Sequence, residues 1–216
     1  SLPRVRAVGR SEQTPGDGAS APVVVPLTPT ADGSVSLRFG GQVMVGRGLY
    51  APSRTGDAVI PAADDPAAHA AVFSAVTPLL GDADLSVVTL GAPLVDDPYV
   101  GGTRPEGYHP DRPVLLASST ATAAALADAG VDVVNLANNH VYDALDAGLA
   151  STLAALDGAG LAHVGAGGTE AEAWQPAYVD AGDQRVAFLG CTAFGGSRYP
   201  IHFVAGPTQG GAARCA

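Results

Sequence analysis

The stretch VVNLANNHVYD, residues 133–143, decides how the fold is interpreted. Its apolar half predicts a buried strand, which ends abruptly in two asparagines and a histidine at residues 138–140. Polar side chains of this kind are costly to bury without partners, so they either satisfy backbone N–H groups at the start of the next helix or form a functional site. Asp143 and Asp146 can each cap that helix, which leaves the asparagines surplus to capping and favours a site.

The composition limits the classes of protein to consider. The chain has 216 residues, 47% of them hydrophobic and 15% charged, which indicates one folded domain rather than a disordered segment. A formal net charge of −10 argues against nucleic acid as the main partner and against an anionic membrane surface. No apolar run approaches the roughly 20 residues of a membrane-spanning helix. Because the chain begins at Ser1, we expect any signal peptide or lipid anchor to lie outside it.

The chain divides into two unequal parts. Residues 1–34 are rich in proline, glycine and serine and are interpreted as a linker or edge segment, in which Val23–Val25 can add one short strand. Residues 35–216 form one α/β domain, because strand-like and helix-like segments alternate along it. The expected strands cover 34–39, 85–90, 131–137 and 161–165, the expected helices cover 65–80, 118–130 and 146–160, and a hairpin with its turn at Gly182-Asp183 covers 176–193.

Small or polar residues follow four of the expected strands. These strand ends are Gly40–Gln42, Gly91-Ala92, Asn138–His140 and Gly190–Thr192. Because ligands of open α/β sheets bind beyond the carboxyl ends of the strands, we expect the four ends to form the floor of one crevice. Asn138, Asn139 and His140 are its most reactive group.

Four segments of the chain resemble the CapA-type capsule and poly-gamma-glutamate biosynthesis proteins. The most specific is VVNLANNHVYDALDAGLASTLAALDGAGLAHVGAG, residues 133–167. GGQVMVGR at 40–47, DLSVVTLGAPLVDD at 84–97 and RVAFLGCTA at 185–193 occur in the expected order around it. The resemblance extends from about Val35 to Thr192.

The resemblance implies a metallophosphoesterase-like β-sandwich flanked by helices, similar to the calcineurin-like enzymes, of which the chain covers either the whole or only the N-terminal part. It implies that Asn139 and His140 bind a divalent metal, with Mn, Fe or Zn as candidates, and that His140 also acts as the general acid on a phosphate. Asp143 then orients the loop. Oxygen ligands suit such a metal, and imidazole can donate a proton near neutral pH.

The chain departs from the family pattern where the family has acidic metal ligands. The first strand of the family normally ends in Gly-Asp, and this chain has Gln42 instead. The second normally ends in Asn-Leu-Glu, where this chain has Gly91. His202 is the one histidine after the last expected strand, and its context does not match the family's later histidine motifs. The sequence therefore favours a lost or altered metal site over an intact one.

Two functional hypotheses follow. The first is a CapA-like protein of the cell envelope, outside the cytoplasm, that acts in capsule or poly-gamma-glutamate biosynthesis as a metal-dependent hydrolase or transferase on an anionic polymer, a glycan or a phosphorylated precursor. The second is a non-catalytic binding or scaffold module with an eroded metal site, which binds a polymer or an envelope protein. In both, Gln42, Arg47 and Asn138 are candidate substrate-binding residues, although Gln42 can equally hold a turn and Arg47 can equally be a surface residue.

Several residues outside this group have simpler interpretations. His69 and His109 are expected to be exposed, the latter in a long surface loop at residues 96–113. Cys191 and Cys215 match no metal or redox spacing and either pair in an oxidising compartment or remain thiols.

Overall fold

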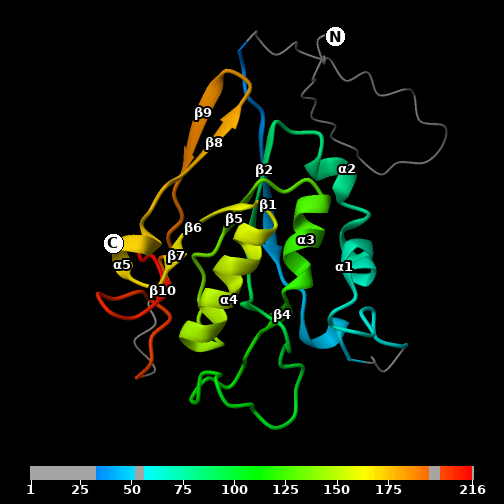
Figure 1. Cartoon of the computed structure of the whole chain (residues 1–216), viewed down its shortest axis with the longest axis vertical. Coiled ribbons are helices and arrows are strands. Elements are labelled where there is room, and N and C mark those ends of the chain that lie inside the picture. Colours follow the sequence, from blue (N-terminus) through cyan, green and yellow to red (C-terminus); the bar gives the residue numbers. More distant parts are fainter. Residues whose placement is uncertain (1–32, 52–55, 195–199, 216) are drawn as a thin grey trace, which may run out of the picture.

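A computed structural model describes residues 33–51, 56–194 and 200–215 (Figure 1). The strand predicted at Val23–Val25 and most of the predicted linker lie outside these residues. The described residues form a mixed α/β structure built on a parallel sheet, which confirms the predicted class at that level.

The central sheet has four parallel strands in the order β1-β2-β5-β6. The strands are β1 (Leu37–Val43), β2 (Leu85–Leu90), β5 (Val133–Asn135) and β6 (Ala162–Val164). Because the strands are parallel, their carboxyl ends meet at one edge of the sheet, the lower edge in Figure 1. Three of the four predicted strand ends, those of β1, β2 and β5, therefore do lie together.

Four helices cover one face of this sheet. They are α1 (Pro66–Phe73), α2 (Thr77–Leu80), α3 (Ala121–Asp128) and α4 (Leu145–Gly158). Figure 1 shows α4, α3 and α1 side by side in this order from left to right. The main hydrophobic core lies between the two layers and includes the fully buried side chains of Leu126, Val134 and Leu156.

The helix predicted at 65–80 is two helices instead of one. Asp65 caps the first helix, because its carboxylate accepts hydrogen bonds from the backbone N–H groups of Ala67 and Ala68. The chain then turns at Ser74 and restarts at Thr77, with Pro78 in the first turn of α2. Proline has no N–H for the ladder of a continuous helix but is accommodated at a helix start, which explains the break.

A β-hairpin packs on the opposite face of the sheet. It consists of β8 (Ala177–Ala181) and β9 (Gln184–Phe188), joined at Gly182-Asp183 as predicted. Phe188 and Ala181 contribute to a second hydrophobic cluster with Val87 and other residues of the central strands. The end of β9 is therefore not a fourth end of the central sheet, but Gly190 still returns to it: a Cβ at Gly190 would lie 2.2 Å from Asn135 Oδ1.

Short elements complete the described structure. They are a 3₁₀ turn at Arg47–Leu49, β3 (Leu94–Val95) paired with β4 (Ser118–Ser119), β7 (Ala166–Gly167) paired with β10 (Gly211–Ala212), and α5 (Glu170–Ala173). A disulfide joins Cys191 to Cys215, which answers the question that the sequence left open. The bond and the β7–β10 pair attach the last described residues to the domain.

Strand β1 corrects one detail of the sequence interpretation. The strand does not stop at Gly40-Gly41 but continues to Val43, with a shift in its register to β2 between Phe39 and Gln42. Glycine tolerates such an irregularity and a close approach, since a Cβ at Gly40 would lie 3.0 Å from Val88 Cγ1. Gln42 is thus a residue of the strand, paired with Thr89, and not part of a loop after it.

The helices that the structure describes include none with the length and apolar character needed to cross a bilayer.

Leu126→Ala tests the position of the core. Leu126 is 0% exposed between the helices and the sheet, so its truncation should lower the free energy of unfolding by about 2–5 kcal/mol in urea denaturation. Leu189→Ala is the matched control: this side chain is 64% exposed, and the change should stay within about 0.5 kcal/mol. Equal effects of the two substitutions would contradict the described core.

Candidate functional site

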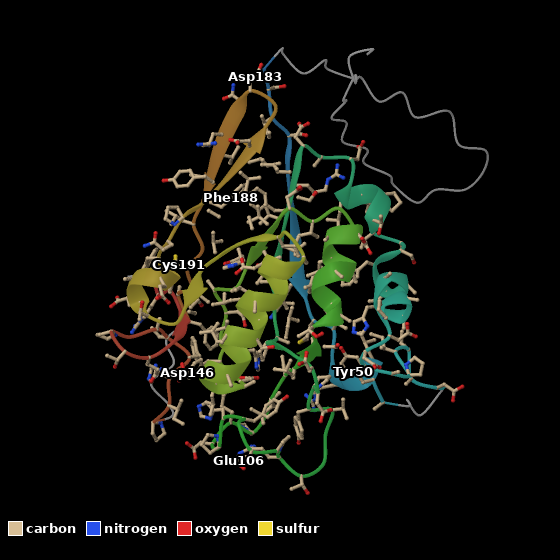
Figure 2. All side chains as sticks on the ribbon, viewed as in Figure 1. Tyr50, Glu106, Asp146, Asp183, Phe188 and Cys191 are labelled. Atoms are coloured by element: carbon tan, nitrogen blue, oxygen red, sulfur yellow. A yellow bond between two sulfur atoms is a disulfide. The ribbon has the colours of Figure 1, made fainter. Side chains whose placement is uncertain are left out.

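Three separate segments meet beyond the carboxyl ends of the central strands. They are the turn between β5 and α4, the long loop that contains residues 96–113, and the segment at 200–210. Figure 1 shows the long loop below the sheet, and Figure 2 places Asp146 and Glu106 at this same lower end. The candidate site of the sequence analysis is therefore enclosed by loops rather than lying on an open sheet edge.

The carboxylate of Asp143 joins the turn to the long loop. Its side chain is fully buried. One oxygen accepts a hydrogen bond from Arg112 Nη1 at 2.6 Å, and the other accepts from the backbone N–H of Leu116 at 2.8 Å and interacts with His140 at 2.7 Å. Its backbone carbonyl also accepts from the N–H of His109. A buried carboxylate is stable only with such partners, so this network fixes the shape of the site.

His140 is held by Asp143 and remains partly accessible. Its Nδ1 lies 2.7 Å from Asp143 Oδ2, and its side chain is 17% exposed. Because the carboxylate is an acceptor, Nδ1 carries the proton that it donates, which leaves Nε2 available to a ligand. An imidazole oriented by a carboxylate in this way can exchange a proton with a bound molecule.

The two asparagines have different environments. Asn138 is buried, and its amide is used internally: Nδ2 donates to the carbonyls of Leu90 and Leu136, and Oδ1 accepts from the N–H of His140. It therefore ties the turn to the end of β2. Asn139 is only half buried, and Arg112 donates to its backbone carbonyl. Asn139 is the more exposed of the two and is therefore the better candidate for contact with a ligand.

Gln42 and Gly91 complement each other across the strands β1 and β2. A Cβ at Gly91 would lie 2.1 Å from Gln42 Nε2 and 2.7 Å from its amide carbon. The Gln42 side chain therefore occupies the space into which a longer residue at position 91 would extend. These are the two positions at which the resembling family has Asp and Glu.

The side chains at this edge do not fit the divalent metal that the resemblance implies. The ones at hand are the amides of Gln42 and Asn139 and the Nε2 atom of His140, all neutral, while Asp143 is enclosed by its own partners. Among the described residues, no three His, Cys, Asp or Glu side chains gather in a way that could hold a metal ion. Neutral amides do not offset the charge of a divalent cation, so this donor set is a poor one.

Arg47 lies at the same edge, on the rim of a small cavity. The cavity has a volume of about 200 Å³ and is lined by Arg47, Met44, Ala92 and Leu116 among others. Arg47 is exposed and has a φ of 40°, an unusual backbone conformation for a residue with a side chain. Leu116 donates its N–H to Asp143, so the cavity adjoins the network that holds His140.

Two histidines that were predicted to be exposed are buried, and those predictions were wrong. His69 is enclosed because Nδ1 meets the carbonyl of Asp65 and Nε2 meets the Tyr50 hydroxyl at 3.0 Å. His109 is enclosed because Nε2 meets the carbonyl of Ile201 at 2.9 Å, across 92 residues of sequence. A histidine satisfied at both ring nitrogens can be buried without charge, and the sequence around either one does not show its partners.

Arg112 is the important residue that the sequence analysis missed. It is nearly buried, it donates to Asp143, and its guanidinium lies 6.0 Å from the centre of the Phe203 ring. The available signal was a pair of arginines, Arg104 and Arg112, in a loop that is otherwise acidic. Its partners on the turn between β5 and α4 could not be identified from the sequence.

The predicted cap of α4 is also different. The N-cap is Ala144, without a side-chain hydrogen bond, and Asp143 is used in the network described above. Asp146 instead interacts with the Tyr142 hydroxyl, and burial together with this hydrogen bond raises the pKa of Tyr142 far above its ordinary value. Tyr142 therefore remains a donor and helps to hold the start of the helix against the turn.

The fold and the site define an α/β protein with a histidine–carboxylate pair at the carboxyl end of a parallel sheet. The family model for the bacterial capsule synthesis protein PGA_cap matches residues 36–212. The chain belongs to this family, which confirms the resemblance noted from the sequence. Among curated proteins, none matches the chain.

Asp143→Asn should destabilise the protein strongly. The substitution leaves the Arg112 guanidinium buried without its counter-charge, and breaking a buried pair in this way costs about 3–5 kcal/mol of unfolding free energy. Asp157→Asn is the control, because Asp157 makes an exposed pair with His163 and should contribute less than about 1 kcal/mol. Urea denaturation of both variants measures the difference, and a small effect at position 143 would argue against the network.

Proposed function

We propose that this chain serves bacterial capsule synthesis as a binding module whose crevice holds a polymer, and that it does so without a resident catalytic metal. The placement of Gln42 over Gly91 is the observation that supports this most directly. An amide and a glycine stand where the resembling family has two carboxylates, and the amide fills the vacated space. Gln42 and Gly91 therefore pack against each other, and they do not leave the empty space that would remain if a metal site had lost only one ligand.

The site retains groups that recognise hydroxyl and carboxylate groups. His140 offers Nε2, Asn139 offers an amide, and Arg47 offers an exposed cation at the adjoining cavity. Arginine and amide groups suit the carboxylates of an anionic polymer or the hydroxyls of a glycan. Because the net charge of the chain is −10, we propose that a carboxylate polymer is bound through these local groups and not through the overall field.

A location in the cell envelope fits this role. Capsule synthesis is the function associated with the family, and the described cysteines form a disulfide, a bond that persists in oxidising compartments. We propose the envelope as the working location, with an envelope protein as a further candidate partner.

A metal-dependent hydrolase of the metallophosphoesterase type, with the corresponding β-sandwich, is the second candidate. The observation in its favour is the 2.7 Å contact between His140 and Asp143, which orients an imidazole as acid–base catalysis requires. The proposal of a binding module and this alternative differ in two measurable properties, namely turnover and metal affinity.

Incubation with a defined polymer tests turnover, because a binding module holds the polymer intact whereas a hydrolase shortens it. Poly-gamma-glutamate oligomers should bind the full chain saturably in isothermal titration calorimetry, and His140→Ala and Arg47→Ala should each weaken binding roughly tenfold through the loss of a charged or polar contact. Arg185→Ala, which removes an exposed arginine on the hairpin, is the control and should bind normally. Shortening of the oligomers during incubation with Mn²⁺, absent in His140→Ala, would instead support the hydrolase.

Metal affinity tests the second property. The double variant Gln42→Asp, Gly91→Glu should bind Mn²⁺ at least roughly tenfold more tightly than the unmodified chain, because it adds two carboxylates and shortens the side chain that fills the space. Gly91→Glu alone should gain less Mn²⁺ affinity than the double variant, since its new side chain competes for space with the side chain of Gln42. If the unmodified chain already binds Mn²⁺ as tightly as the double variant, the proposed loss of the metal site is wrong.

A further inference from the structure

Strand β1 forms an outer edge of the central sheet. Among the described strands, only β2 pairs with it, and it pairs on one side. The carbonyls of Ser36 and Val43 accept hydrogen bonds from the N–H groups of Leu85 and Gly91 in and beside β2. Because backbone polar groups alternate in direction along a strand, those of Leu37 and Phe39 point away from β2. Such an edge is a template for a further strand.

A cavity of about 450 Å³ lies along this edge, on the helical face of the sheet. One wall is formed by β1 from Arg38 onward and by the two residues after it, Met44 and Val45, and the other is formed by α1, α2 and the turn between them. The helical wall is apolar and consists of Val72, Phe73, Val76, Leu79 and Leu80. The result is a groove between an edge strand and a helical layer, which is the arrangement that binds extended peptides by strand addition.

The rim of this groove exposes large apolar side chains. Met44 is 54% exposed, Val76 is 41% exposed and Leu79 is 61% exposed. On the other face of β1, Leu37 and Phe39 are also exposed, at 40% and 67%. A strand added to this edge would place alternate side chains beside each of these two apolar surfaces.

The Arg38 guanidinium in the groove has one nitrogen without a hydrogen-bond acceptor. Arg38 Nη1 is buried and makes no hydrogen bond within the described structure, while Nη2 lies 4.0 Å from Asp82. A buried guanidinium N–H without an acceptor is unfavourable, and a carboxylate is its best match. The groove therefore combines an apolar wall with one site for a negative charge.

We propose that the groove between β1 and α1–α2 binds an extended polypeptide by strand addition. The ligand is a segment with apolar side chains at alternate positions and one acidic residue, whose carboxylate meets Arg38 Nη1. Its backbone pairs with the outward groups of Leu37 and Phe39, and its apolar side chains cover Val76 and Leu79. The groove runs along β1 as far as Gln42 and Met44, so it adjoins the candidate site but does not include His140.

The test uses the full chain and the labelled peptide acetyl-KTVTETVTK-amide, in which the glutamate and both valines point to the same face of the strand, with the neutral analogue KTVTQTVTK for comparison. The acidic peptide should bind saturably in fluorescence anisotropy, and the neutral analogue should bind roughly tenfold more weakly. Arg38→Gln should remove the preference between the two peptides. In hydrogen exchange, the acidic peptide should slow the amides of Leu37 and Phe39.

A matched pair of variants locates the binding surface. Leu79→Ser should weaken the acidic peptide several-fold, and Tyr178→Ser, which changes a side chain of similar exposure on strand β8, should not. The proposal is overturned if neither peptide binds saturably, or if Arg38→Gln leaves the preference unchanged. It is also overturned if the amides of Leu37 and Phe39 are already protected in the free chain, because another segment or a second copy then occupies the edge.

Discussion

The buried carboxylate of Asp143 is the constraint on which the site depends. It holds the guanidinium of Arg112 at 2.6 Å and the Nδ1 atom of His140 at 2.7 Å, and it also receives the N–H of Leu116. These contacts attach the long loop to the turn that follows β5, although the two segments are 31 residues apart in sequence. A single ionised side chain thus both closes the lower end of the domain and sets the orientation of the imidazole that is available to a ligand.

The retained and the altered halves of the site lie on different strands. The turn after β5 keeps its asparagines, its histidine and its carboxylate in one hydrogen-bonded unit, in which Asn138 also secures the end of β2. The ends of β1 and β2 carry Gln42 packed over Gly91 in place of acidic side chains. The hydrogen bonds around His140 attach the turn to the long loop and to the end of β2, so this unit contributes to the stability of the fold whether or not the site binds a metal.

The sequence predicted those parts of the structure that depend on local patterns. The alternation of strands with helices and the Gly182-Asp183 hairpin follow from periodicity and turn chemistry, and they are confirmed. Pro78 breaks the helix predicted at 65–80, and periodicity alone does not show that break. The role of Arg112 was not visible, because buried polar partners distant in sequence come together only through the tertiary fold.

The tautomer of His140 tests the central claim most directly. Long-range ¹H–¹⁵N NMR spectra of the full chain, recorded where the imidazole is neutral, should show His140 protonated at Nδ1 and unprotonated at Nε2. The Asp143 carboxylate selects this tautomer, because it accepts the Nδ1 proton and has none of its own to donate. A His140 protonated at Nε2, or one that exchanges between both tautomers, would contradict the account.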